Sequence, residues 1–154
     1  MITLLKRVKA RLQDQIEYIR KSDFLIVVDE DIFKDGFKKY FIGIKDGGGD
    51  IGVRTSDAGT DWDILIDVVI WVRLHKSEAT IIGDDSSPDN KGVFTIMADV
   101  FTTLDNYYLP NTAGVEYVET AESQGWAPSE IFGDEDTSYI QKLKTTMRYV
   151  INKT

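Results

Sequence analysis

The chain has 154 residues, of which 42% are hydrophobic and 29% charged, and its formal net charge at pH 7 is −8. About 150 residues bury enough surface for a self-sufficient core, so we expect one domain over residues 1–154. The sequence has no cysteine and one histidine, which excludes disulfides, thiol catalysis and multi-histidine metal sites. Its acidic balance disfavours nonspecific binding to the phosphates of nucleic acids.

Charge is distributed unevenly along the chain. Residues 77–137 contain 13 acidic side chains and one basic side chain, Lys91, whereas the remainder has 17 basic and 13 acidic residues. Both ends of the chain are basic, and its middle is acidic. No apolar run approaches the ~20 residues that a membrane-spanning helix needs, so we expect no membrane partner.

The first third of the chain predicts one helix followed by extended segments. Apolar residues at steps of three and four predict an amphipathic helix over residues 2–22. The apolar run at 24–33 ends in acidic residues and is typical of either a strand or a loop. Alternation predicts a strand over 37–45, and the Gly- and Asp-rich residues 46–61 predict a long loop or open hairpin, a kind of segment that is often functional.

The middle of the chain contains the clearest strand pattern. Every even-numbered residue from Trp62 to Leu74 is apolar, which predicts a strand over residues 62–75. The odd-numbered positions are half polar, so we expect them to face solvent or another chain. Residues 77–90 are predicted to form an acidic loop in which Ser87 and Pro88 introduce the next helix, over 93–106.

The last third predicts two further strands, at 115–122 and 139–151, with an irregular segment over 123–137 between them. Together these elements predict an α+β fold. We expect a twisted, largely antiparallel sheet of four to five strands, with two helices packed mainly on one face.

A glycine motif invites a cofactor hypothesis that its context excludes. The sequence GGGDIG at residues 47–52 satisfies the G-x-G-x-x-G pattern of dinucleotide-binding proteins. That pattern needs a helix directly afterwards, whose N-terminus holds the pyrophosphate. Here the turn-like VRTSDAGTDWD follows and leads into a strand, so we expect no cofactor.

Three groups of carboxylates are candidate cation ligands, because hard cations prefer several oxygens. They lie at residues 29–31, 84–89 and 134–136, and none has the spacing of a calcium-binding loop. Solvated turns are the preferred interpretation, and no metal site is predicted. His75 has no nucleophile motif near it, so no catalytic residue is assigned. A small metal-dependent hydrolase that uses one carboxylate cluster remains the alternative from another class.

The candidate functional residues are those suited to contacts between proteins. Tryptophan is enriched in interfaces, and opposite charges on separate parts of a chain can set the register between two copies. These candidates are Trp71, Arg73, Glu116, Glu119, Glu122, Trp126, Lys142, Lys144 and Arg148. We expect the three basic residues of the last strand to face the three glutamates, either within the sheet or across subunits. The docking-loop candidates are Gly47, Gly48, Gly49, Asp50, Arg54 and Asp57.

The succession of segments resembles the tail-terminator family of long-tailed bacteriophages, also called tail-completion or tail-to-head joining proteins. The resembling segments are ITLLKRVKARLQDQIEYI, YFIGI, the glycine-rich loop, WDILIDVVIWVRL, GVFTIMADVFTTL, VEYVET and YIQKLKTTMRYVIN. They cover nearly the whole chain. Residues 77–90 depart from the family's pattern and leave open a role as another neck or head-completion protein.

The resemblance implies a virion structural protein of the tail or neck, assembled in the host cytoplasm, with no catalytic residues. Members of the family form a homohexameric ring that caps the tail tube, stops its growth and joins the tail to the head connector. The implied partners are other copies of this chain, the tail-tube protein and the head-tail connector protein. DNA passes through such a ring without specific binding. A monomeric binding module of a cell is a third hypothesis.

Overall fold

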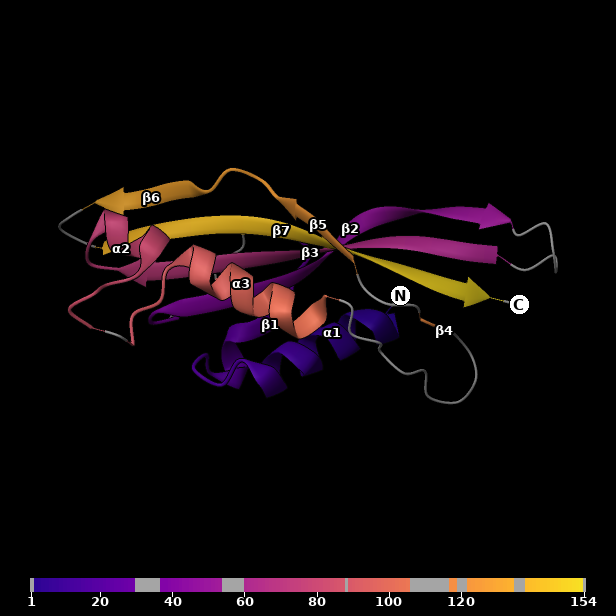
Figure 1. Ribbon diagram of the computed structural model, residues 1–154, viewed down its shortest axis with the longest axis horizontal. Coiled ribbons are helices and arrows are strands. Elements are labelled where there is room, and N and C mark those ends of the chain that lie inside the picture. The colour runs from indigo at the N-terminus through magenta and orange to yellow at the C-terminus, as the bar shows by residue number, and fades with distance from the viewer. Residues whose placement is uncertain are drawn as a thin grey trace.

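In the computed structural model, a long sheet is covered on one face by helices (Figure 1). The structure describes residues 2–29, 37–53, 60–87, 89–105, 117–118, 122–134 and 138–153. Its helices are α1 (Ile2–Gln15), the 3-10 turn η1 (Lys21–Asp23), α2 (Ser77–Ile82) and α3 (Val93–Leu104). Its strands are β1 (Phe24–Ile26), β2 (Tyr40–Val53), β3 (Thr60–Leu74), β4 (Tyr117–Val118), β5 (Glu122–Trp126), β6 (Glu130–Asp134) and β7 (Ser138–Lys153).

Three long strands form the body of the sheet. β3 lies between β2 and β7 and is antiparallel to both. β1 joins the outer edge of β2 in parallel, opposite residues 42–44 only. On the outer edge of β7, β4, β5 and β6 follow one another and together form one interrupted strand. Within the described residues, both edges of the sheet are therefore incompletely paired.

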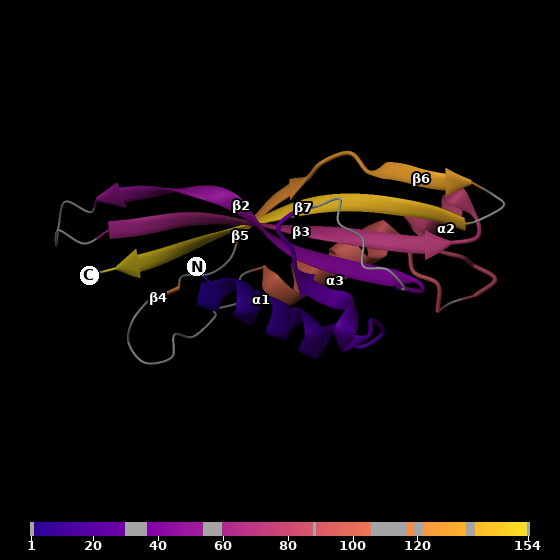
Figure 2. The same cartoon turned by 180° about the vertical axis from the view of Figure 1, so that it is seen from behind.

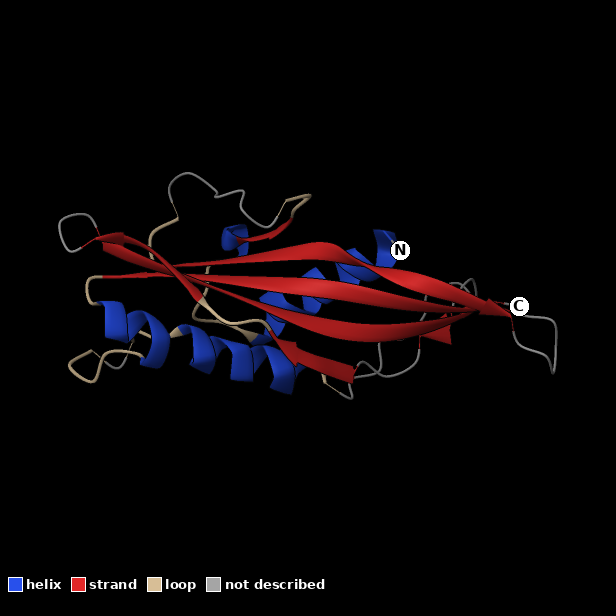
Figure 3. Ribbon diagram, turned by 90° about the horizontal axis from the view of Figure 1, so that it is seen from above, coloured by secondary structure: helices blue, strands red, loops and turns tan. Residues whose placement is uncertain are grey.

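The even-numbered side chains of β3 point toward the helices and form the centre of the main core. Ile66, Val68 and Ile70 are fully buried there, and burial of each such side chain contributes about 1.5–3 kcal/mol. α1 and α3 each present an apolar stripe to this face, so both lie on it and contact one another (Figure 3). The stripes are Leu4, Val8 and Leu12 of α1, and Val93, Ile96 and Val100 of α3.

A smaller apolar cluster lies on the opposite face. Phe37, Phe41, Val69 and Trp71 are buried in it, and Ile140 packs against them. The odd-numbered positions of β3 are therefore divided into two halves. Residues 37–41 help to cover the half near the C-terminal end of β3, and the other half carries polar side chains.

The three long strands continue past the two main helices, and β4 pairs with β7 at that end. Figure 2, seen from behind, shows β2, β3 and β7 running on beyond α1 and α3 at the end opposite α2. This end holds the second half of β2 and the first half of β3, where Ile51 is 60% exposed. None of the described helices is long and apolar enough to cross a membrane.

The predicted fold class is confirmed, and so are the two main helices and the strands β3 and β7. The described sheet has seven strands in place of four to five, but β4, β5 and β6 share the position of one. The first helix ends at Gln15, seven residues earlier than predicted. Ile16 and Ile19 are buried all the same, so the apolar spacing persists where the backbone has left the helix.

Three segments predicted as loops contain regular structure. Within 46–61, β2 continues to Val53 through a bulge between Asp46 and Gly49, where Gly48 has φ 92°, so the open-hairpin alternative is correct. Residues 77–90 contain α2, which is too short for a periodic signal. The helix after them begins at Val93, so the expected start at Ser87 and Pro88 is wrong. Residues 123–137 include most of β5 and all of β6. Backbone pairing with β7 stabilises these two strands, although their sequences do not alternate between apolar and polar residues.

We predict that Gly49→Ala destabilises the fold at the bulge of β2. A Cβ at this position would lie 2.3 Å from the carbonyl oxygen of Asp63, a backbone atom that cannot move without disturbing β3. The expected loss is about 1–3 kcal/mol in the free energy of unfolding, measured by urea denaturation. Gly52→Ala is the matched control in the same strand, because nothing lies within 4 Å of its Cβ. Equal midpoints for the two variants would contradict this geometry.

Candidate subunit interface

Arg148 links three strands on the polar half of the outer sheet face. Its Nε and Nη2 donate to the two carboxylate oxygens of Asp63 in β3, both at 2.8 Å. Its Nη1 donates to Glu122 in β5 at 3.0 Å. The hydrogen bonds that Arg148 donates to Asp63 and, secondly, to Glu122 raise the pKa of Arg148. The charged guanidinium therefore ties the edge strand to the centre of the sheet.

The expected pairing of basic and acidic residues is realised within the sheet for one pair. Arg148 and Glu122 form the salt bridge described above. Glu116 and Glu119 lie outside the described residues. Lys144 is half-buried, and its backbone carbonyl accepts a hydrogen bond from the backbone of Ala127 at 3.0 Å.

Two residues predicted to contact another chain are covered by their own chain. Trp71 is 1% exposed, with the ring of Phe132 5.9 Å away, centre to centre. Lys142 is 5% exposed, and its Nζ lies 5.4 Å from the centre of the Trp71 indole. Cation–π contact explains why an apolar ring and a lysine share this position. Because neither side chain reaches the surface, both leave the set of interface candidates.

Trp126 remains a candidate for contact with another chain. It is 54% exposed on β5, at the interrupted edge of the sheet. Its ring also leans on α3, 6.4 Å from the ring of Phe94 and 6.5 Å from that of Phe101. Phe132 and Ile131 of β6 are exposed along the same edge. This edge thus combines incomplete backbone pairing with apolar surface.

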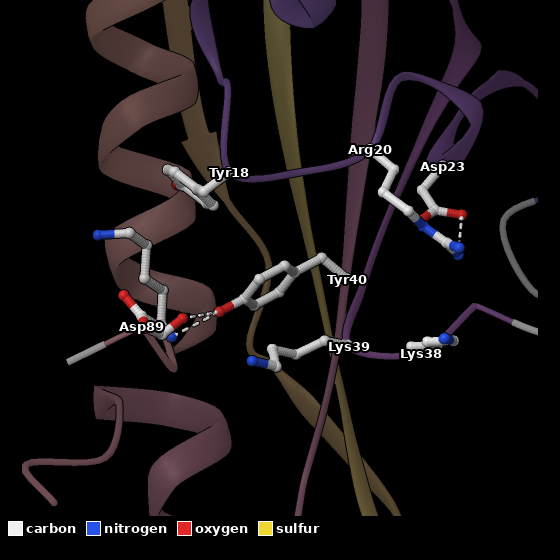
Figure 4. A pocket seen from close by; sticks show the side chains of 8 residues that line it. Tyr18, Arg20, Asp23, Lys38, Lys39, Tyr40 and Asp89 are labelled. Carbon is white, nitrogen blue, oxygen red and sulfur yellow. Dashed lines mark hydrogen bonds and ion pairs between the residues drawn. The ribbon is translucent and has the colours of Figure 1, made fainter. Parts of the chain in front are cut away.

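A cavity of about 410 Å³ opens beside the first residues of β2. Figure 4 shows Tyr40 extending across it toward Asp89. The Tyr40 hydroxyl donates to the backbone carbonyl of Asp89 at 2.7 Å and accepts from the backbone N–H of Lys91 at 2.8 Å. The charged lining residues are Arg20, Lys38, Lys39, Lys91, Asp23 and Asp89. Basic side chains exceed acidic ones, and Asp23 is already paired with Arg20 at 2.8 Å.

Two tyrosines give this cavity a fixed wall. The rings of Tyr18 and Tyr40 meet edge to face at 5.8 Å, and Lys91 Nζ lies 4.8 Å from the centre of the Tyr18 ring. Tyr18 donates a hydrogen bond to the carboxylate of Asp99. Burial, and then this contact with Asp99, raises the pKa of Tyr18, and burial also raises that of Tyr40. Both hydroxyls therefore stay protonated at neutral pH.

A second cavity, of about 450 Å³, shares Lys38 and Lys39 with the first. Its other lining residues are Arg73, Leu74, His75, Ser87, Asn90 and Ser138, with no carboxylate side chain among the described residues. The guanidinium of Arg73 lies 4.7 Å from the centre of the Phe37 ring, and its buried Nε has no hydrogen-bond partner in the described part of the chain. We call these two adjoining cavities the basic end.

The opposite end of the β2–β3 hairpin is acidic. A third cavity, of about 470 Å³, is lined there by Asp46, Gly48, Gly49, Asp50, Ile51, Trp62, Asp63 and Ile64, a group that we call the acidic end. The side chains of Asp46 and Asp50 each accept a backbone hydrogen bond within the strand, at 2.8 and 3.1 Å. The docking-loop candidates Gly47, Gly48, Gly49 and Asp50 thus lie in β2. Arg54 and Asp57 lie outside the described residues.

The sequence analysis did not identify the basic end. Its signal is the Lys38–Lys39 pair immediately before β2, but the other basic residues come from distant segments. The chemistry that this end supports is the binding of anionic groups. Across the described ranges, no three carboxylates or histidines lie close enough together to hold a metal ion. His75 is exposed at the end of β3, as expected of a residue at the rim.

The whole fold is similar to a component of a known virus-like particle. A chain in the solved structure "Virion of native gene transfer agent (GTA) particle" superposes with a TM-score of 0.55 at 11% sequence identity. The match covers 97% of this chain and 94% of the other. No protein-family model and no curated protein matches the sequence. At this level of identity the match establishes a shared fold.

Proposed function

We propose that this chain is a virion structural protein of the tail-terminator type. In this proposal, copies form a homohexameric ring that caps the tail tube, stops its growth and joins the tail to the head connector. Its partners are other copies of itself, the tail-tube protein and the head-tail connector protein. The protein acts in the tail or neck of the particle, after assembly in the host cytoplasm.

The observation that carries the proposal is the likeness of fold to a virion component. It spans almost all of both chains, so the two folds share the same elements and not merely one motif. The sequence also resembles the tail-terminator family in the succession of its segments. A fold alone does not fix a function, so the open edges and the charge layout supply independent support.

The described surface has features suited to contacts between copies. Among the described residues, most of β2 has no partner on its outer edge, and the opposite edge of the sheet is interrupted and apolar at Trp126 and Phe132. Incompletely paired edges favour association with another chain. The two ends of the hairpin differ in charge, which suits a contact in which one patch meets a different patch on the next copy. The net charge of −8 is compatible with DNA passing without adhering.

We predict that the purified protein self-associates without tube or connector. Sedimentation velocity at low and moderate salt is expected to reveal a species about six times the mass of the 17.4 kDa chain. Its stability is expected to change with salt, because screening weakens charge complementarity between copies. A monomer alone at every salt concentration would remove the main support for the ring.

We also predict that divalent cations leave thermal stability unchanged, in contrast with the hydrolase alternative. A ligand that binds the folded state raises its melting temperature by mass action. Millimolar Mg²⁺, Mn²⁺ and Ca²⁺ are compared with NaCl of equal ionic strength in a thermal-shift series. A rise of several degrees with one cation, absent in the NaCl control, would favour the hydrolase.

A further inference from the structure

We propose that the basic end of one copy binds the acidic end of the β2–β3 hairpin of a second copy. This inference rests on the proposed function, because it assigns the surfaces through which neighbouring copies of a ring would meet. The ligand is a protein surface that presents aspartate carboxylates beside exposed apolar groups. The receptor is the pair of cavities that share Lys38 and Lys39.

The receptor concentrates positive charge in a concave site. Lys38 is exposed and Lys39 half-buried between the two cavities, and Arg73 and Lys91 add a positive charge from either side. The cavity with Arg73 has only basic and neutral lining residues within the described segments. Asp84 and Asp85, on the α2–α3 connection, line a different cavity.

Arg73 supplies a positive charge in this receptor that no described carboxylate lining the same cavity neutralises. Its guanidinium is held against Phe37, and its buried Nε has no acceptor in the part of the chain that the structure describes. An unsatisfied buried donor costs about 1–3 kcal/mol or more when its group is charged. Ser138, on the rim of the same cavity, has φ 146°, a strained conformation for a residue with a side chain. Arg73 as a whole is half-buried, so an incoming carboxylate would meet the positive charge of its guanidinium at the cavity.

The acidic end offers the complementary surface. Asp50 is exposed beside Ile51, which is 60% exposed, and Trp62 and the exposed Asp46 line the same cavity. Asp63, in the same lining, is already paired with Arg148 of its own copy. Carboxylates next to an apolar group match lysines and an arginine next to the rings of Tyr40 and Phe37. The contact would therefore join charge pairing at its rim to apolar burial at its centre.

The two ends cannot neutralise one another within one copy. Asp50 lies opposite Asp63 of β3, and ten residues of this continuous strand, about 33 Å at ~3.3 Å per residue, separate that position from Arg73. That distance exceeds the Debye length of about 8 Å at physiological salt. Asp50 and the basic end can therefore pair only between two copies. Such a contact has one direction, which closes into a ring when the rotation between copies permits.

We predict that reversing charge at the basic end weakens self-association. The double variant Lys38→Glu with Lys39→Glu is expected to raise the concentration for half-assembly about tenfold or more in sedimentation velocity. Lys6→Glu with Lys21→Glu changes the net charge by the same amount at exposed positions outside the two cavities, so it is the matched control. Circular dichroism verifies that each variant is folded.

A complementary variant tests the pairing directly. Asp50→Lys alone is expected to weaken assembly, and an equimolar mixture with the Lys38→Glu, Lys39→Glu variant is expected to restore it, because every junction then joins opposite charges. If the Lys38→Glu, Lys39→Glu variant does not fold, a second readout uses wild-type protein alone. A mixture of ¹⁵N-labelled and unlabelled protein is coupled with a carbodiimide, which joins lysines to nearby carboxylates. It is expected to join Lys38 or Lys39 of one copy to Asp50 of another.

The outcomes separate this inference from the proposed function. A wild-type protein that stays monomeric overturns both. If the wild type assembles and the Lys38→Glu, Lys39→Glu variant assembles as well as the control variant does, only the pairing of the two ends is overturned. The wild type can also be tested with a short DNA duplex. If it binds the duplex, and the Lys38→Glu, Lys39→Glu variant loses this binding but self-associates as before, the basic end binds phosphate and the pairing is overturned.

Discussion

The pairing of β3 with β2 and β7 is the constraint on which the rest of the structure depends. A slip of one residue would turn every side chain of β3 to the other face. The observed register turns Ile66, Val68 and Ile70 toward α1 and α3. It also turns Asp63 outward, within reach of Arg148. Because β2 and β3 run in opposite directions, the same pairing brings Lys39, just before β2, beside Arg73 at one end, and Asp50 opposite Asp63 at the other.

Alternation and helical spacing predicted most of the fold. β3 and β7 alternate along almost their whole length, and α1 and α3 have clear apolar stripes, so the layers followed from the sequence. The missed elements lack such a signal. β2 passes through glycines by means of a bulge, and β5 and β6 are held by backbone hydrogen bonds that do not depend on side-chain pattern.

The candidate site was predictable only where its residues lie on adjacent strands and contact each other directly. Arg148 and Glu122 were expected to pair, and they do so across the edge of the sheet. Trp71 was expected at the surface, but local alternation cannot reveal that Phe132 and the segment around Phe37 cover its face of the sheet. The basic end was also missed, because its charges come from four segments that only the fold brings together. Long-range packing, which a single sequence does not encode in any local pattern, explains these failures.

We propose that this polypeptide is a building block whose surfaces join copies into a closed assembly. Negative-stain electron micrographs of the purified protein test that claim most directly, because closure is visible without knowledge of any partner. We expect ring-shaped particles of uniform diameter with a central opening. A field of small separate particles at micromolar concentration, or open fibres in place of rings, would contradict it.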